Sequence, residues 1–179
     1  MWRACVLRAF VGLVLVLLAA LGCKGLFEKE ERSEMKQTDI SVWQAIEVLV
    51  KQIPFSKQKV EEVLSTQLTE VEEGFNKLFH FYKGEPIGLA EGVVISGVDL
   101  RIRREAGHPG FLVLEISGAA ISLQQVQSRY AKLEITQAPR GRSAQEQTSF
   151  TQAFPWGKLS FGFKEQNRNG LASIAFEPA

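Results

Sequence analysis

The spacing of apolar residues changes at Gly74, and this change limits the folds that the chain can adopt. Before Gly74, apolar residues recur every three or four positions, which is the period of a helix with one buried side. After Gly74, apolar and polar residues mostly alternate, which is the period of a strand with one buried side. Turns that contain glycine or proline separate the alternating segments. The sequence therefore predicts an α+β fold, an antiparallel sheet with helices packed on one face.

Three segments have the helical period. The first follows Asp39, which can cap a helix, and it ends at Pro54. The second begins at Ser56. Its buried stripe comprises Val60, Val63, Leu64, Leu68 and Val71. The third covers 122–130, where Ser122 and Gln125 have the spacing of a capping box. Alternation predicts strands at 75–82, 89–95, 98–104, 111–117, 133–136, 148–154, 157–164 and 171–177.

The first 22 residues have the composition of a signal peptide. Arg3 and Arg8 make the start positive, and an uncharged apolar run of 13 residues follows from Ala9 to Leu21. A helix that crosses a bilayer needs about 20 apolar residues, so this run is too short unless Arg8 lies inside the membrane. We expect this segment to be cleaved, and an uncleaved membrane anchor is the alternative.

The apolar run ends in Ala20-Leu21-Gly22-Cys23, which resembles a bacterial lipobox. The resemblance implies that Cys23 is lipidated and becomes the first residue of the mature protein. In lipoproteins a residue other than Asp at the next position, here Lys24, directs the protein to the outer membrane. Lipoboxes prefer leucine where Ala20 stands and a small residue where Leu21 stands, so these two are exchanged here. The alternatives are an inner-membrane anchor, or a secretory signal cut near Ala20, which leaves a soluble periplasmic protein.

Processing at Cys23 divides the chain into a signal peptide (1–22), a lipidated cysteine with a charged flexible tether (23–37) and a binding domain (38–179). Eight of the fourteen residues from Lys24 to Gln37 are charged, which is typical of a solvated linker. A frayed helical extension of the next segment is the alternative. The full chain has a formal charge of +1, so it has no overall field that attracts nucleic acid, and we expect no nucleic-acid partner.

The segments 56–117 and 122–178 are candidate repeats. The sequences Ser56-Lys-Gln-Lys-Val60 and Ser122-Leu-Gln-Gln-Val126 share serine, glutamine and valine at an offset of 66 residues. After the lipobox, the predicted order is a helix followed by three or four antiparallel strands, and this order occurs twice. It resembles the β-lactamase-inhibitor-protein type, which is a tandem of such units. One unit resembles the small lipoprotein of the outer-membrane β-barrel assembly machinery. These resemblances rest on the order of elements and carry no catalytic or binding residue to this chain.

The sequence contains no set of residues that predicts catalysis. Only His80 and His108 could act as the base for a serine nucleophile, and neither lies near a G-x-S-x-G turn. No phosphate-binding glycine loop, calcium loop or H-E-x-x-H zinc motif is present. A cysteine nucleophile is excluded if Cys5 is removed and Cys23 is acylated. We therefore expect no catalytic residue, no metal, no cofactor and no enzymatic activity.

One side of the predicted sheet carries charged and aromatic residues. Alternation places Asp99, Arg101 and Arg103 on an outer face, opposite Val98, Leu100 and Ile102. It also places Ser160 on that face, opposite Leu159 and Phe161. Arginine and aromatic side chains contribute strongly to protein interfaces. The candidate partner-binding residues are Tyr82, Arg101, Arg103, Phe111, Arg140, Arg142 and Trp156. A solvated sheet face with a buried Trp156 is the alternative.

These patterns together predict a lipoprotein that faces the periplasm, is held to the membrane by its lipid anchor and binds an envelope protein. The first hypothesis is an immunity or inhibitor protein, which blocks the active cleft of an envelope-targeting toxin by steric contact. The second is an accessory lipoprotein of outer-membrane or envelope assembly. The candidate duplication favours the first hypothesis, because the assembly lipoprotein has a single unit.

Overall fold

The computed structural model describes residues 35–72 and 76–179. The predicted signal peptide, Cys23 and most of the predicted tether lie outside the described residues. Three α-helices, two short 3-10 helices and ten strands make up the described part. In chain order they are β1 (Lys36–Gln37), α2 (Val42–Val50), α3 (Lys57–Leu64), β2 (Leu68–Val71), β3 (Phe79–Gly84), β4 (Ile87–Gly88), η1 (Ala90–Gly92), β5 (Val93–Arg103), β6 (Phe111–Gly118), α4 (Leu123–Arg129), β7 (Glu134–Gln137), β8 (Gln147–Phe154), β9 (Gly157–Lys164), η2 (Glu165–Asn167) and β10 (Leu171–Pro178).

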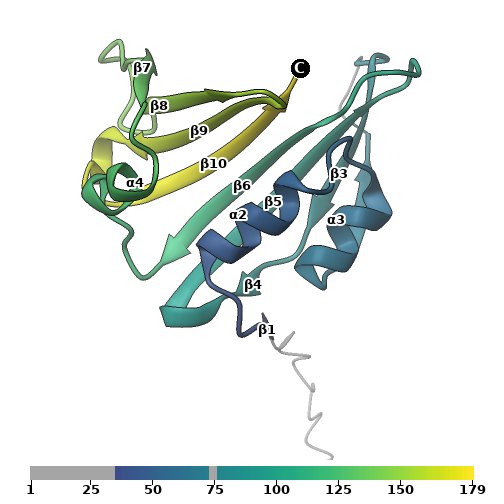
Figure 1. Ribbon diagram of the computed structural model, residues 1–179, viewed down its shortest axis with the longest axis horizontal. Helices are drawn as coiled ribbons and strands as arrows, with labels where there is room; N and C mark the ends of the chain where they lie inside the picture. The colour runs from purple at the N-terminus through teal and green to yellow at the C-terminus, as the bar shows by residue number, and fades with distance from the viewer. Residues whose placement is uncertain (1–34, 73–75) are drawn as a thin grey trace, which may run out of the picture. The chain divides into compact units, whose positions relative to one another are not determined.

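One mixed sheet contains all ten strands and dominates the fold (Figure 1). Strand β1 pairs with β4 in parallel, and the other strand pairs are antiparallel. Strand β5 is long enough to pair with β4 near its start and with β3 along the rest of its length. The order then continues β5-β6-β10-β9-β8-β7, while β2 lies beyond β3. The predicted α+β class is therefore correct in its coarse form, with more sheet than helix.

The elements after Pro54 form two series of the same kind. Helix α3 precedes β2, β3, β5 and β6, and helix α4 precedes β7, β8, β9 and β10, with the short β4 as an addition to the first series. The last strand of each series lies in the middle of the sheet, where Leu112 of β6 pairs with Phe176 of β10 and Leu114 pairs with Ile174. The first strands, β2 and β7, lie at opposite ends. The two series therefore run outward in opposite directions from the β6–β10 pair.

Serine side chains begin the three helices. Ser56 caps α3 and Ser122 caps α4, as predicted, because each hydroxyl accepts a hydrogen bond from the backbone N–H three residues later. The predicted cap at Asp39 is wrong, since α2 begins after Ser41, which forms a capping box with Gln44. These caps satisfy backbone donors that the first turn of a helix leaves without a partner.

Helix α3 is shorter than its predicted stripe. Ser65 follows it in a left-handed conformation (φ 51°), which ends the helix at Leu64. The predicted helical positions of Leu68 and Val71 are therefore wrong, and both residues lie in β2. The end of the predicted tether also differs, because Lys36 and Gln37 form β1 and the Gln37 side-chain amide donates to the Leu89 carbonyl (3.0 Å).

The core lies against one side of the strands, which we call the core side. Alternate residues are buried along the central strands, as predicted for Val98 and Leu100 on β5 and for Leu159 and Phe161 on β9. Apolar residues from the helices belong to the same buried cluster, which includes Ile46, Leu49, Val60, Leu64 and Val126. Among the described residues, no helix has the length and apolar content required to cross a membrane.

Candidate functional site

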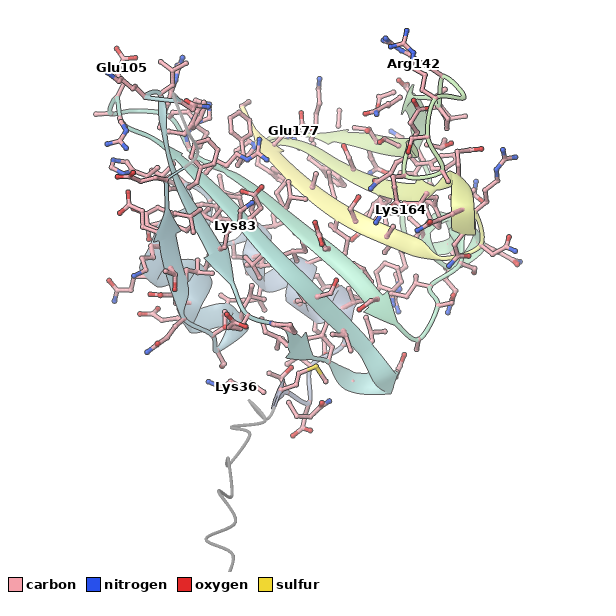
Figure 2. All side chains as sticks on the ribbon, turned by 180° about the vertical axis from the view of Figure 1, so that it is seen from behind. Lys36, Lys83, Glu105, Arg142, Lys164 and Glu177 are labelled. Carbon is pink, nitrogen blue, oxygen red and sulfur yellow. The ribbon has the colours of Figure 1, made fainter. Side chains whose placement is uncertain are left out.

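The side chains that alternate with the core residues form the outer face of the sheet (Figure 2). Residues that pair across antiparallel strands share a face, so the register assigns each side chain to a row that crosses several strands. One row comprises Ser149, Gly162, Ser173 and Glu115; the next comprises Thr151, Ser160, Ala175, Val113, Asp99 and Lys83. A further row contains Ala153, Lys158 and Glu177 on β8 to β10, and Phe111, Arg101 and Phe81 on β6, β5 and β3. Arginines and aromatic residues therefore lie on the β3–β6 half, and short hydroxyl residues lie on the β7–β10 half.

Aromatic rings and arginines meet at one end of the β3–β6 half. The arginine–aromatic cluster comprises Phe79, Phe81, Arg101, Arg103, His108 and Phe111. The ring centre of Phe79 lies 6.1 Å from that of Phe81 and 6.0 Å from that of Phe111. The His108 ring lies 4.6 Å from the Phe111 ring, and the Arg101 guanidinium lies 5.7 Å from the centre of the Phe81 ring. The structure thus brings together the predicted residues Arg101, Arg103 and Phe111.

Asp99 holds the guanidinium of Arg101 in place. Its carboxylate accepts hydrogen bonds from Arg101 Nε (3.2 Å) and Nη2 (2.7 Å), and Lys83 Nζ lies 2.9 Å from the same carboxylate. Burial acts to raise the pKa of Asp99, but the hydrogen bonds from Arg101 and Lys83 outweigh it, and the pKa lies below its ordinary value. Asp99 is therefore ionised at neutral pH and orients Arg101 on the outer face.

Two predicted partner-binding residues lie on the core side of the sheet. Tyr82 pairs with Leu100, which is buried, so the register places Tyr82 on the face opposite Arg101. Trp156, in the turn between β8 and β9, stacks on Phe154 with ring centres 5.4 Å apart and packs against the core. Neither residue therefore lies on the outer face with Arg101: strand register places Tyr82, and apolar packing places Trp156, in line with the alternative of a buried Trp156.

The other two predicted arginines, Arg140 and Arg142, are exposed in the loop between β7 and β8. The carboxylate of Glu146 organises this loop by accepting hydrogen bonds from the backbone N–H groups of Arg140 (2.6 Å), Gly141 (2.9 Å) and Arg142 (3.4 Å). Figure 2 shows Arg142 and Glu105 at opposite corners of the sheet, and Glu105 lies in the turn that joins β5 to β6. The loop arginines therefore lie apart from the arginine–aromatic cluster.

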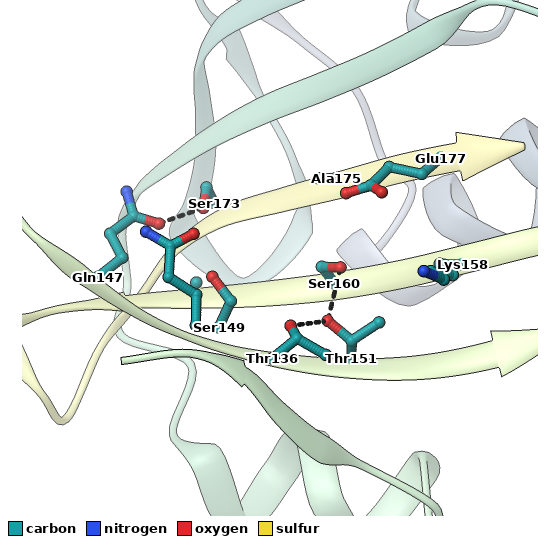
Figure 3. A pocket seen from close by; sticks show the side chains of 11 residues that line it. Thr136, Gln147, Ser149, Thr151, Lys158, Ser160, Ser173, Ala175 and Glu177 are labelled. Carbon is teal, nitrogen blue, oxygen red and sulfur yellow. Dashed lines mark hydrogen bonds between the residues drawn. The ribbon is translucent and has the colours of Figure 1, made fainter. Parts of the chain in front are cut away.

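The β7–β10 half of the outer face contains a groove of about 360 Å³ that is lined by polar side chains (Figure 3). The hydroxyl groove comprises Thr136, Gln147, Ser149, Thr151, Ser160 and Ser173, with Lys158 and Glu177 at one end. The Thr151 hydroxyl lies 2.7 Å from that of Thr136 and 2.8 Å from that of Ser160. The Ser173 hydroxyl donates a hydrogen bond to the side-chain oxygen of Gln147 (2.7 Å). This oxygen lies above Gly162, and a Cβ atom at Gly162 would collide with it. The sequence placed Ser160 on the outer face but gave no sign of the groove.

Among the residues that the structure describes, neither histidine has a hydrogen bond to a serine hydroxyl. His80 Nδ1 lies 2.6 Å from a carboxylate oxygen of Glu70, and His108 Nδ1 accepts a hydrogen bond from the backbone N–H of Gly110 (3.0 Å). In residues 35–72 and 76–179, no group of three or more His, Cys, Asp or Glu side chains is placed to hold a metal ion. The outer face thus has two chemically different halves, one with the arginine–aromatic cluster and one with the hydroxyl groove.

No protein-family model, curated protein or solved structure matches this chain.

Proposed function

We propose that this chain is an outer-membrane lipoprotein, anchored through Cys23, that faces the periplasm and binds an envelope protein without catalysis. The arginine–aromatic cluster is the observation that carries the proposal. In the first form of the proposal, the chain is an immunity or inhibitor protein that covers the active cleft of an envelope-targeting toxin. In the second form, it is an accessory factor of outer-membrane or envelope assembly.

The composition of the arginine–aromatic cluster supports binding to a protein. Arg101 and Arg103 are exposed, and the rings of Phe79 and Phe111 are half-buried beside them. Arginine and large aromatic side chains are enriched at the centres of protein interfaces, where a few residues supply most of the binding energy. Asp99 already restrains Arg101, so binding would lose less side-chain entropy than it would with an unrestrained arginine.

The arrangement of helices and repeats completes the proposal. Helices α2, α3 and α4 would cover the core side, which leaves the outer face for the partner, and the shared buried cluster supports this placement. The segments 56–117 and 122–178 would be true repeats, which the two series of elements and the central β6–β10 pair support. A duplicated unit favours the inhibitor form over the assembly form, because the assembly lipoprotein that the chain resembles has one unit.

The test is a pull-down of the tagged full chain from the detergent-solubilised envelope of its own bacterium. We compare the wild type with the variant Arg101→Glu/Arg103→Glu and with a matched control, Lys51→Glu/Lys132→Glu. The control reverses the same amount of charge at exposed lysines outside the cluster. We expect the wild type and the control to capture the same protein and the cluster variant to lose it.

The identity of the captured protein separates the two forms. A hydrolase that the purified chain inhibits supports the immunity form, whereas a component of the β-barrel assembly machinery supports the accessory form. If the wild type captures no protein, or if the cluster variant captures as much as the wild type, the proposed interface is contradicted.

A further inference from the structure

We propose that the hydroxyl groove binds a neutral carbohydrate, in the form of about one or two sugar rings of a glycan. The groove lies on β7 to β10, whereas the arginine–aromatic cluster lies on β3, β5 and β6. This inference goes beyond the protein-binding function proposed above and does not depend on it.

The lining of the groove is unlike the centre of a protein interface. Serine and threonine are under-represented among the residues that dominate protein binding, and aromatic residues are enriched there. The groove contains hydroxyl side chains from four strands and no aromatic ring. The aromatic residues of β8 and the following turn, Phe150, Phe154 and Trp156, pack against the core instead. This half of the outer face therefore suits a ligand of different chemistry.

The floor of the groove is a preformed line of hydroxyl groups. Thr151 is only 6% exposed and is the one buried polar residue among the described residues. Its hydroxyl forms one hydrogen bond with that of Thr136 and one with that of Ser160. These two hydrogen bonds use two of the three O–H donors in the line. One donor and several lone pairs remain for a ligand. A sugar hydroxyl both donates and accepts, so it can continue such a line in either direction.

The Gln147 side chain extends the polar lining across the sheet. Its oxygen is fixed by the hydrogen bond from Ser173, so its Nε2 group retains two donors that can meet sugar oxygens. Gly162 lies beneath this side chain, and its missing Cβ allows the amide to lie close to the sheet. The amide is thus held in one position before a ligand arrives, which favours binding.

The charge and the volume of the groove restrict the ligand. Lys158 and Glu177 are paired in strand register and give the lining a formal charge of zero. Both residues line the groove, where their charged groups could hydrogen-bond to a ligand. A neutral lining favours a neutral ligand over a phosphate or an anionic polymer. The volume of about 360 Å³ lies near the lower end of ligand pockets, about 300 to 1,000 Å³.

The test is calorimetric titration of the purified full chain with maltotriose and with tri-N-acetylchitotriose at millimolar concentration. Ala175→Tyr fills the groove from its floor and keeps every hydroxyl, and Thr151→Val removes the central hydroxyl. The matched control is Thr69→Val, because Thr69 is exposed on β2 and pairs with Lys83 of the outer face, far from the groove in strand order. We expect the wild type and the control to bind at least one trisaccharide, and both groove variants to bind it at least about tenfold more weakly.

Folding and interface effects are separated by two further measurements. Thermal unfolding identifies any groove variant that fails to fold, and Ala175→Tyr should remain folded because its side chain lies on the outer face. Arg101→Glu/Arg103→Glu should bind the sugar as the wild type does, even if the protein-binding proposal fails. The carbohydrate proposal is overturned if the wild type binds neither trisaccharide, or if a folded Ala175→Tyr variant binds as tightly as the wild type.

Discussion

The substitution Asp99→Asn tests whether the carboxylate that orients Arg101 also stabilises the fold. Asparagine keeps the shape of the side chain but removes its charge, and it offers one acceptor oxygen where the carboxylate offers two. Arg101 would lose its two-pronged hydrogen bond to this carboxylate, and Lys83 would lose its ion pair with Asp99.

The expected loss of unfolding free energy is modest. The side chain of Asp99 is 16% exposed, and those of Lys83 and Arg101 are each 44% exposed. A solvent-exposed ion pair contributes about 0.2–1 kcal/mol, and charge-assisted hydrogen bonds to a half-buried carboxylate contribute somewhat more. Two such partners give a total of about 1–2 kcal/mol at pH 7.

The pH dependence follows from the direction of the pKa shift. Because the pKa of Asp99 is lower in the folded protein, the ionised carboxylate stabilises the fold at every pH above its ordinary pKa of about 3.9. This contribution disappears as the pH falls through the lower pKa of the folded state. The difference in unfolding free energy between wild type and Asp99→Asn should therefore be constant from about pH 6 to pH 8 and shrink below about pH 4.

Urea unfolding followed by circular dichroism at pH 7 and at pH 3 measures both quantities. Asp39→Asn is the matched control, because Asp39 is exposed and should change the unfolding free energy by less than about 0.5 kcal/mol. An Asp99→Asn effect that is the same at both pH values, or no larger than the effect of Asp39→Asn, would refute the role assigned to the carboxylate.

Three further substitutions test other parts of the structure. Ser122→Ala removes the capping box of α4 and should lower the unfolding free energy by about 1 kcal/mol in urea titrations, so an unchanged midpoint contradicts the assigned cap. Glu146→Gln weakens three backbone hydrogen bonds and should speed amide hydrogen exchange at 140–142, while exchange in β9 stays as it is. Cys23→Ser should abolish incorporation of labelled palmitate, and labelling at the wild-type level would exclude Cys23 as the lipidation site.

Local features of the fold were predictable because neighbouring residues determine them. Ser122 and Gln125 form their capping box from adjacent turns, and the boundaries of β9 follow from the alternation of residues 157–164. The cap at Ser41 was missed because Asp39, two residues earlier, also has the side chain of a good N-cap. Local signals thus located the elements but did not always choose between two neighbouring caps.

The outer face was predictable only where one side of a strand is clearly apolar. On β5, Leu100 contrasts with Asp99 and Arg101, so the alternation fixes the two faces. On β3, Phe79 and Phe81 alternate with His80 and Tyr82, so both sides are aromatic and only pairing with β5 decides between them. The spacing of Phe79, Phe81 and Lys83 puts these three residues on one face of the strand, but it does not say that this face is the outer one.

The hydroxyl groove was not predictable because it depends on contacts between distant segments. Thr136, Thr151 and Ser160 come from three strands, and Ser173 joins them only because β10 lies beside β9. Pairing between β6 and β10 connects residues about sixty positions apart. Local spacing carries no information about such register, so the sequence named Ser160 without its neighbours.

The position of β10 has a consequence for how a growing chain reaches its final structure. β10 is the last described strand to be synthesised, yet it occupies the middle of the sheet, between β6 and β9. Until its residues leave the ribosome, the apolar edges of two half-sheets stay open and available for wrong partners. Removal of 171–178 would therefore separate the half-sheets from each other, because β10 pairs with both β6 and β9. Loss of β7 would remove only an edge strand, because β7 pairs with β8 alone among the described strands.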